Sequence, residues 1–355
     1  MAGKKILTAM SGGVDSSVTA ALLLEQGFDV EGVTLDLFSH PCTTRSRQPT
    51  DSPAEKAARS AQILGIKHHV LDIQEQFTAE VIEPFVAEYM DGRTPNPCVR
   101  CNQKIKFGVL LDWTLKQGYA ALATGHYVQV KRSQSACTLH RAEDRSKDQS
   151  YALYRLGQHQ LCHTLFPLGE LTKTEVRRLA EKFKLPAASA KESQDICFVP
   201  GDDYKQFLQC YRPAAASPGP IVDTQGRVLG QHRGVYNYTV GQRKGLGIAA
   251  PQPLYVVKLD VNTNTVVVGT SKEIYSDKFL VSDYNFVAGH PPADVFETEV
   301  MTRYNSRPAP ARVKLIDDCL QVELAAPQRA VTPGQSAVFY RQNQVLGGGI
   351  IKQRI

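Results

Sequence analysis

The stretch Ala9-Met10-Ser11-Gly12-Gly13-Val14-Asp15-Ser16-Ser17 decides the fold of this chain. It continues the apolar run at 6–10 and leads into the helix-like residues 18–24, so we expect a strand, a tight Gly-Gly turn and a helix N-terminus. Such a junction binds anions, because backbone N–H groups face the ligand and the helix dipole adds partial positive charge. The hydroxyls of Ser11, Ser16 and Ser17 would add donors. The stretch lacks the Gly-Lys-Ser/Thr ending of a Walker P-loop, which argues against an ordinary P-loop ATPase.

Strand and helix patterns alternate through the first half of the chain. Ser52-Pro53-Ala54-Glu55 has the spacing of a capping box with Pro at the first helical position, so a helix should run from there to about Leu64. The other expected elements are strands at 3–10, 29–38, 68–73 and 119–124, and helices at 15–26, 77–90 and 103–116. This alternation predicts an α/β fold with a Rossmann-like parallel sheet covered by helices. Ligands of such sheets bind at the carboxyl ends of the strands, where residues 9–17 would lie.

Composition changes in the second half. Thr172-Lys173-Thr174-Glu175 is a second capping box, and the helix that it opens should end near Leu185. From about Pro213 the chain is rich in Gly, Pro and short β-like runs, and from about Asp277 polar and apolar residues alternate in several short strands, as in a small β-barrel. We therefore expect three domains: an α/β domain at 1–205, a small central β-rich domain at 206–274 and a C-terminal β-barrel at 275–355.

Composition places the chain among soluble globular proteins, with 355 residues, 42% hydrophobic and 21% charged. No apolar run approaches the roughly 20 residues that cross a bilayer, and Met1-Ala2-Gly3-Lys4-Lys5 enters a strand without room for a signal peptide, so we expect a cytoplasmic protein without membrane contact. The segment from Lys205 to Asp260 contains seven Lys or Arg residues and only two Asp, which gives it a net charge of +5. This segment suits a polyanion such as nucleic acid, although solvated basic residues without a partner would look the same.

The eight cysteines of a cytosolic chain do not indicate a disulfide framework. Two of them, Cys98 and Cys101, lie in the loop Thr94-Pro95-Asn96-Pro97-Cys98-Val99-Arg100-Cys101-Asn102. Because Cys101 should come just before a helix and beside Arg100, we expect a lowered thiol pKa and a reactive thiolate. The Cys-x-x-Cys spacing also fits half of a zinc site, but such a site needs two more ligands, and the sequence offers no second close pair.

Together, several motifs resemble the tRNA-specific 2-thiouridylases of the ATP-pyrophosphatase superfamily. They are the Ser-Gly-Gly-x-Asp-Ser loop, the Asn-Pro-Cys-x-x-Cys-Asn loop, Ser193-Gln194-Asp195-Ile196-Cys197-Phe198, Ala123-Thr124-Gly125-His126-Tyr127, Lys147-Asp148-Gln149-Ser150-Tyr151, Tyr238-Thr239-Val240-Gly241-Gln242-Arg243-Lys244-Gly245, Arg303-Tyr304 and Thr332-Pro333-Gly334-Gln335. The motifs extend in order from residue 9 to about residue 340, so the resemblance covers nearly the whole chain.

This resemblance implies replacement of the C2 oxygen of the wobble uridine by sulfur in the tRNAs for Lys, Glu and Gln, with ATP and Mg²⁺ as cofactors. ATP would be bound by Ala9, Met10, Ser11, Gly12, Gly13, Val14, Asp15, Ser16, Leu35 and Gly125. The target base would be contacted by Asn96, Pro97 and Cys98, and the tRNA by Lys147, Asp148, Gln149, Arg303 and Tyr304. His126 and Gln335 would lie near the site, and the basic central domain would bind tRNA. No metal is expected on protein ligands alone.

The resemblance also implies roles for two thiols. Transfer of AMP to the C2 oxygen would make it a leaving group, and an external sulfur carrier or cysteine desulfurase would leave a persulfide on Cys197. Sulfur would reach C2 either from that persulfide directly or as sulfide released when Cys101 attacks it, and the second route leaves a Cys101–Cys197 disulfide. Some members of the family have Asp where this chain has Cys98, so we treat Cys98 as a contact residue and Cys101 as the nucleophile.

Three other interpretations remain at this stage. An amide-forming synthetase or argininosuccinate-type ligase uses the same loop but needs no pair of reactive cysteines. A 4-thiouridine synthase is chemically closer, but it would be expected to carry a separate RNA-binding domain before the loop. A non-catalytic tRNA- or zinc-binding protein would use the basic segment and the Cys-x-x-Cys pair structurally.

Overall fold

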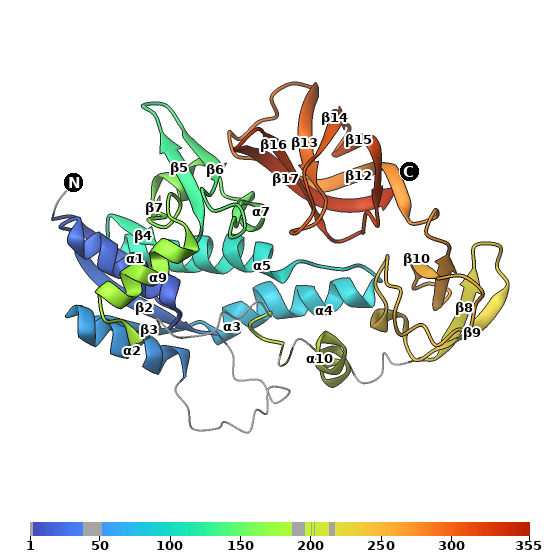
Figure 1. Cartoon of the computed structure of the whole chain (residues 1–355), viewed down its shortest axis with the longest axis horizontal. Coiled ribbons are helices and arrows are strands. Elements are labelled where there is room, and N and C mark those ends of the chain that lie inside the picture. The colour runs from blue at the N-terminus through green and yellow to red at the C-terminus, as the bar shows by residue number, and fades with distance from the viewer. Residues whose placement is uncertain (1–2, 38–51, 187–195, 200, 202, 213–216) are drawn as a thin grey trace.

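A computed structural model describes residues 3–37, 52–186, 196–199, 201, 203–212 and 217–355 (Figure 1). The expected motif residues 193–195 therefore lie outside the described residues, whereas Ile196, Cys197 and Phe198 lie inside them. Among the described helices, none is both long and apolar enough to cross a membrane.

A five-stranded sheet forms the centre of the N-terminal domain, and all of its neighbouring strands are parallel. Its order is β3 (His68–Asp72), β2 (Asp29–Asp36), β1 (Lys5–Ala9), β4 (Ala121–Ala123) and β7 (Thr164–Leu165). This confirms the predicted α/β, Rossmann-like fold. The strand order reverses between β1 and β4, and the crevice at such a reversal is where open parallel sheets bind ligands.

Neighbouring strand residues point to opposite faces of this sheet and give it two cores. Ile6 and Ala121 pack with Leu23 of α1 (Val14–Glu25), whereas Leu7 and Leu122 belong to a different cluster with Phe107. On the first face, α1 packs between α2 (Pro53–Leu64) and α9 (Lys173–Lys182). Both predicted capping boxes are present, with Ser52 and Thr172 as the N-caps of α2 and α9.

The other face carries two long helical stretches that each contain a π-helical segment. The first is α3 (Gln74–Phe77), η2 (Thr78–Ile82) and α4 (Glu83–Met90), and the second is α5 (Pro97–Arg100), η3 (Cys101–Leu110) and α6 (Leu111–Lys116). The prediction that the second helix begins at Gln103 was wrong. It begins at Pro97, because the Asn96 side chain accepts hydrogen bonds from the backbone N–H groups of Cys98 and Val99 and caps the helix earlier.

Two β-rich units follow the α/β domain. The helix α10 (Tyr204–Tyr211) precedes them in the chain and packs against α4, below it in Figure 1. The central unit has the 3₁₀ turn η7 (Val235–Asn237) and a four-stranded sheet in the order β10 (Tyr255–Asp260), β11 (Thr265–Gly269), β8 (Gly219–Asp223), β9 (Val228–His232). The C-terminal unit has the order β12 (Tyr275–Phe286), β15 (Cys319–Arg329), β14 (Ala309–Ile316), β13 (Val295–Met301), β16 (Ser336–Arg341), β17 (Gln344–Arg354), and β12 also pairs with β17. This ring confirms the predicted barrel, while the boundaries at 205 and 274 stay a prediction.

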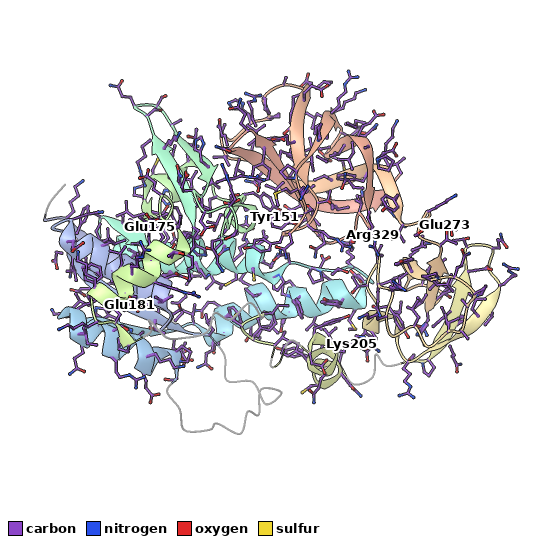
Figure 2. All side chains as sticks on the ribbon, in the orientation of Figure 1. Tyr151, Glu175, Glu181, Lys205, Glu273 and Arg329 are labelled. Atoms are coloured by element: carbon purple, nitrogen blue, oxygen red, sulfur yellow. The ribbon has the colours of Figure 1, made fainter. Side chains whose placement is uncertain are left out.

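The barrel is joined to both other units. A hairpin of β5 (Val128–Arg132) and β6 (Cys137–Arg141), followed by α7 (Ser150–Leu153) and α8 (Gln158–Cys162), extends the barrel sheet because β6 pairs with β17. On the other side, the Arg329 guanidinium lies over the Tyr255 ring at 5.0 Å, at the junction with the central unit (Figure 2). The Gln335 side chain donates a hydrogen bond of 2.7 Å to the Thr94 carbonyl, just before α5. The barrel therefore supports the segment that carries Cys98 and Cys101.

Glu31 links β2 to three neighbouring segments of the sheet. Its carboxylate contacts Lys5 at 2.8 Å, His69 at 2.6 Å and the Tyr119 hydroxyl at 2.6 Å. Burial alone would raise the pKa of Glu31, but the hydrogen bonds from Lys5, Tyr119 and His69 outweigh it and lower the pKa to about 2. A carboxylate with a depressed pKa stabilises the fold above its unfolded pKa, and that stabilisation is lost as the pH falls through the folded value.

Glu31→Gln should therefore lower the free energy of unfolding at pH 7 by about 2 kcal/mol, a figure reduced because solvent screens the exposed Lys5 and His69. The difference between variant and wild type should shrink as the pH falls from 4.5 towards 2. Urea unfolding at pH 7 and pH 3 measures it. A difference of equal size at both pH values would show that Glu31 stabilises the sheet by packing rather than by charge.

Candidate active site

The loop after β1 has the geometry of an anion-binding turn. Gly12 has a φ of +76°, and a Cβ there would lie 2.7 Å from the Pro53 carbonyl, so only glycine fits. Gly13 is the N-cap of α1 and has no side chain to satisfy the first N–H groups of the helix. The Ser16 hydroxyl accepts a hydrogen bond from the Ser11 N–H at 3.1 Å, while Ser11 itself is exposed. Unsatisfied N–H groups and an exposed hydroxyl thus meet at a helix N-terminus.

Ser17 and Asp15 have roles that the sequence analysis did not predict. Ser17 is fully buried and donates to the Gly13 carbonyl at 3.1 Å, so its expected part as an anion donor was wrong. Asp15 accepts hydrogen bonds from the Tyr127 hydroxyl at 2.7 Å and from Lys173 at 2.7 Å. Lys173 was missed, because its only sequence signal was its place as the first helical residue after the N-cap Thr172.

Gly125 and Leu35 come from the ends of the neighbouring strands. A Cβ on Gly125 would lie 2.9 Å from both the carbonyl carbon of Asp15 and the backbone nitrogen of Ser16, so the segment after β4 packs directly on the start of α1. Leu35 is partly buried near the end of β2 and packs against the cores on the η3 side of the sheet. Residues 9–16, Leu35 and Gly125 therefore lie at or near the carboxyl ends of three adjacent strands, β1, β2 and β4, and their joint role in binding a nucleotide stays a prediction.

Cys98 and Cys101 occupy the first turns of the second long helical stretch. Cys98 is exposed, whereas Cys101 is only 8% exposed. Burial raises the pKa of Cys101, and the nearby Lys106 offsets only part of this rise, so the expected lowering of the pKa was wrong. There are two reasons: Cys101 lies inside the helix rather than at its start, and Arg100 pairs with Glu80, its Nη2 lying 3.3 Å from Oε2.

Cys197 reaches the same place from a distant part of the chain. Its neighbours Ile196 and Phe198 pack in one hydrophobic cluster with Cys101, and the Phe198 ring contacts Phe85 with centroids 5.2 Å apart. The Cys197 side chain borders solvent on one side. Its surroundings nevertheless raise its pKa to about 12, first through burial and then through the charges of Cys101 and Cys98. Salt screens such interactions beyond roughly 10 Å, and the residues on both sides of Cys197 pack in the Cys101 cluster, so the three thiols lie near one another.

Lys106 is the cation of this thiol site, and the sequence analysis missed it. It lies five residues after Cys101 within η3, and the hydrogen bonds of a π-helix link residues i and i+5, so both lie on one side. Its charge favours the thiolate forms of Cys98, Cys101 and Cys197 against the burial that raises their pKa values. A spacing of five gives no signal in a sequence read as an α-helix, which explains the omission.

His126 connects Lys106 to the segment after β4. The Lys106 ammonium lies 3.4 Å from His126 Nε2, and Thr124 Oγ1 lies 2.8 Å from Nδ1. Burial, and then the charge of Lys106, lowers the pKa of His126 well below its usual value, so the ring is neutral near pH 7. Because an ammonium can only donate, Nε2 accepts and the ring proton sits on Nδ1, where it donates to Thr124. Hydrogen bonds therefore connect Lys106, which acts electrostatically on the thiols, to the segment of Thr124 and Gly125 beside the nucleotide loop.

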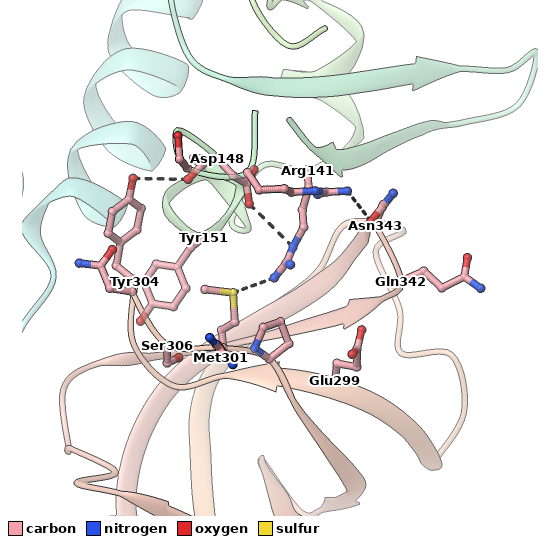
Figure 3. A pocket seen from close by; sticks show the side chains of 14 residues that line it. Arg141, Asp148, Tyr151, Glu299, Met301, Tyr304, Ser306, Gln342 and Asn343 are labelled. Carbon is pink, nitrogen blue, oxygen red and sulfur yellow. Dashed lines mark hydrogen bonds and ion pairs between the residues drawn. The ribbon is translucent and has the colours of Figure 1, made fainter. Parts of the chain in front are cut away.

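A pocket of about 600 Å³ opens between the α/β domain and the barrel (Figure 3). Its walls carry three arginines, Arg141, Arg145 and Arg307. The Tyr304 ring is 43% exposed and packs edge-on against Tyr151, with centroids 6.0 Å apart. Burial, and then the charges of Asp148 and Cys98, raises the pKa of Tyr304, which places the thiol site within electrostatic reach of this pocket.

Several residues expected to contact tRNA have partners within the protein. Asp148 accepts hydrogen bonds from the backbone N–H groups of Ala142 and Ser150, and Gln149 accepts one from Tyr127. Arg303 donates to the Ala330 carbonyl and to Thr332. Hydrogen bonds within the protein thus fix these three side chains, and their direct contact with tRNA stays a prediction, as it does for Lys147 and Tyr304.

The basic segment of the central unit has both of its acids in ion pairs. Asp223 pairs with Arg227 at 2.6 Å, and Asp260 pairs with Lys258 at 2.9 Å. The exposed basic side chains include Arg212, Arg233, Arg243 and Lys244. In the part of the chain that the structure describes, no three His, Cys, Asp or Glu side chains could hold a metal ion together, so the zinc interpretation of Cys98 and Cys101 gains no support there.

Comparisons with known proteins agree over the whole chain. Family models match residues 4–201 ("tRNA methyl transferase HUP domain"), 205–270 ("tRNA methyl transferase PRC-barrel domain") and 276–351 ("Aminomethyltransferase beta-barrel domain"). The chain is 48% identical over 359 residues to the tRNA-specific 2-thiouridylase of Carboxydothermus hydrogenoformans, covering 99% of this chain and 98% of that protein. It is 47% identical over 357 residues to the one from Heliobacterium modesticaldum, covering 99% and 93%. The chain therefore belongs to the family of tRNA-specific 2-thiouridylases.

Proposed function

We propose that this protein is an ATP-dependent tRNA-uridine 2-sulfurtransferase, which replaces the C2 oxygen of the wobble uridine in the tRNAs for Lys, Glu and Gln by sulfur. One observation carries the proposal: the segment of Cys197, far away in the sequence, packs in the same hydrophobic cluster as Cys101. Lys106, on the same helical segment as Cys101, contacts His126 beside the nucleotide loop. Enzymes that only activate a carboxylate or amide with ATP have no use for converging thiols. Sulfur transfer requires them.

ATP activates the uridine in the first step. The C2 oxygen attacks the α-phosphorus, pyrophosphate leaves, and the resulting O-adenylyl group makes C2 electrophilic. The N–H groups at the start of α1 and the exposed Ser11 hydroxyl bind the phosphates. Gly12 and Gly125 shape this loop, because they let its backbone pass close to Pro53 and to the start of α1. Mg²⁺, when bound, offsets the charge of the pyrophosphate. Asp15 is the only acid of the loop and already pairs with Lys173, so we expect ATP itself to supply most of the magnesium ligands.

Sulfur then arrives as a persulfide on Cys197, supplied by an external sulfur carrier or cysteine desulfurase. In one route the terminal sulfur attacks C2, AMP leaves with the oxygen, and Cys101 attacks Cys197 Sγ to break the S–S bond. In the other route Cys101 attacks first and releases hydrosulfide, which attacks C2. Both routes oxidise Cys101 and Cys197 to a disulfide and leave the electron pair on the transferred sulfur, so an external thiol must reduce the enzyme for the next cycle.

The tRNA occupies the space between the α/β domain and the barrel. The anticodon loop already presents unpaired bases, so delivering one uridine to the thiols is inexpensive. Asn96, Pro97 and Cys98 contact that base, and Lys147 and Tyr304 contact the flanking nucleotides. Arg145 and Arg307 of the pocket and the exposed basic residues of the central unit suit the phosphate backbone.

Mass spectrometry of tRNA tests this function. Purified protein, ATP, Mg²⁺, a sulfur donor and tRNA for Glu should give a nucleoside with one oxygen exchanged for sulfur, located at the wobble position. Leaving out ATP should prevent the exchange, and a tRNA without uridine at this position should remain unmodified. A methyl group on the tRNA, as the family-model descriptions would suggest, or sulfur at C4, would overturn the proposal. ATP cleavage with a small amine and no tRNA would favour a ligase instead.

A further inference from the structure

A second pair of thiols lies outside the proposed sulfur-transfer site. Cys137 Sγ and Cys162 Sγ are 2.7 Å apart, closer than sulfur atoms that merely pack together. Cys137 begins β6 and is 4% exposed, whereas Cys162 ends α8 and is exposed. Cys137 belongs to the cluster of Leu139 and Tyr154, not to the cluster that contains Cys101. The proposed reaction does not use either thiol.

The two sulfurs are held together by the elements that carry them. The Gln158 side chain of α8 accepts a hydrogen bond from the Cys137 N–H at 2.8 Å and donates to the Cys137 carbonyl at 2.9 Å, so it pairs with the backbone of β6 like another strand. The same amide donates to the Val287 carbonyl at 2.7 Å. Arg132 of β5 fixes the end of α8, because its guanidinium donates hydrogen bonds to the carbonyls of Leu161 and Thr164. Because α8 and β6 are fixed in this way, the sulfurs need little movement to bond.

The exposure of the two thiols differs in the way that a peroxide-reactive pair requires. The outer thiol, Cys162, can meet an oxidant from solvent, whereas the inner one, Cys137, is almost fully buried. Burial, and then the neighbouring Cys162, raise the pKa of Cys137 to about 11. The charge of the Arg132 guanidinium favours the thiolate and offsets only part of this rise. An inner thiol with a raised pKa is a poor direct target for oxidants but can still resolve an oxidised neighbour.

We propose that Cys137 and Cys162 form a redox-sensitive pair that hydrogen peroxide converts reversibly to a disulfide. Cys162 is oxidised to a sulfenic acid as peroxide is reduced to water. Cys137 Sγ then attacks the oxidised sulfur, the S–S bond forms, and a second water leaves. A dithiol reductant returns two electrons and two protons and restores both thiols.

The bond would close a covalent ring over residues 137–162, which contains Arg141, Arg145, Asp148 and Tyr151 of the pocket wall. Oxidation would therefore restrain the segment that forms this side of the pocket, which we propose contacts tRNA. It would leave Cys101 and Cys197 unchanged. The proposal of the thiol pair itself does not depend on the enzyme's function, because it concerns only the chemistry of these two residues.

Peptide mapping of the full-length protein tests the pair. The protein is treated with hydrogen peroxide, its remaining thiols are blocked with N-ethylmaleimide, and it is digested without reduction. The expected product is a linked peptide that joins Cys137 to Cys162, about tenfold more abundant than any link from Cys162 to another cysteine because the held pair has a high effective concentration. Dithiothreitol should abolish it. Cys319, a half-exposed thiol at the start of β15, serves as the internal control for random oxidation.

The Cys162→Ser variant separates the pair from general oxidation. In this variant Cys137 should stay a free thiol at peroxide doses that fully convert the wild-type pair, and the rise in melting temperature expected for the oxidised wild type should disappear. Recovery of both Cys137 and Cys162 as free thiols at a dose that oxidises Cys319 would overturn the proposal. So would a predominant link of Cys162 to any other cysteine. Measurement of tRNA thiolation is not part of this test, so failure of the proposed function would leave its outcome unchanged.

Discussion

Serine in place of Cys197 or Cys101 should reduce tRNA thiolation to background, a loss of roughly a thousandfold or more. Serine cannot carry a persulfide at position 197, and at position 101 it cannot attack the sulfur of Cys197 to release it. Both side chains lie in the shared thiol site, and neither substitution changes the nucleotide loop. Each variant should therefore still release pyrophosphate from ATP when tRNA is present, because activation of the C2 oxygen precedes sulfur transfer.

Gel retardation with an organomercury matrix measures the thiolated tRNA, and pyrophosphate release measures activation in the same samples. Cys98→Ser is the matched control: it removes an exposed thiol one helical turn before Cys101 and should retain activity within about tenfold of the wild type. An inactive Cys98→Ser variant would overturn our assignment of Cys98 as a contact residue and Cys101 as the nucleophile. Loss of pyrophosphate release in Cys197→Ser would mean that the variant is misfolded or that Cys197 acts earlier.

The features that the sequence predicted well are those set by local chemistry. The Gly12-Gly13 turn, the capping boxes at Ser52 and Thr172 and the alternating pattern of β14 and the first half of β15 each depend on residues a few positions apart. Repetition of such signals was enough to indicate the parallel sheet and the barrel. Even the start of the helix at Pro97 was open to prediction, because Asn96 followed by Pro is a helix-start signal that outweighs the one expected at Gln103.

Features that depend on distant contacts were not accessible in the same way. The sequence places Arg100 next to Cys101, but the fold pairs Arg100 with Glu80 and leaves Lys106, one π-turn away, as the cation at the thiols. Asp148, Gln149 and Arg303 look like solvated polar residues in a linear sequence, yet they hydrogen-bond to the backbone of other segments. The contact of Cys137 with Cys162 likewise needs the pairing of Gln158 with β6. Burial and partner identity are properties of the fold, so a linear sequence does not reveal them.

Lys106→Met should raise the pKa of the thiols at the active site and slow thiolation at pH 7 by about tenfold for each unit of the rise. The sign follows from the charges: the ammonium favours thiolate over thiol, burial opposes it, and methionine removes only the favourable part. The pH dependence of the rate should therefore shift to higher pH in the variant. Under alkaline conditions the variant should recover part of the activity that it has lost relative to the wild type. Lys106→Arg keeps the charge and should shift the profile less.

Lys104→Met provides the matched control, because Lys104 lies two residues earlier on the same π-helical segment, carries the same charge and is exposed to solvent. Iodoacetamide labelling of Cys101 and Cys197 across a pH series gives the thiol pKa values directly, without tRNA. If Lys104→Met and Lys106→Met shift these values equally, the effect comes from net charge and not from the position of one ammonium. If only Lys106→Met shifts them while thiolation stays at the wild-type rate, thiolate formation does not limit the reaction, and the slow step must be adenylation of the uridine or release of the product.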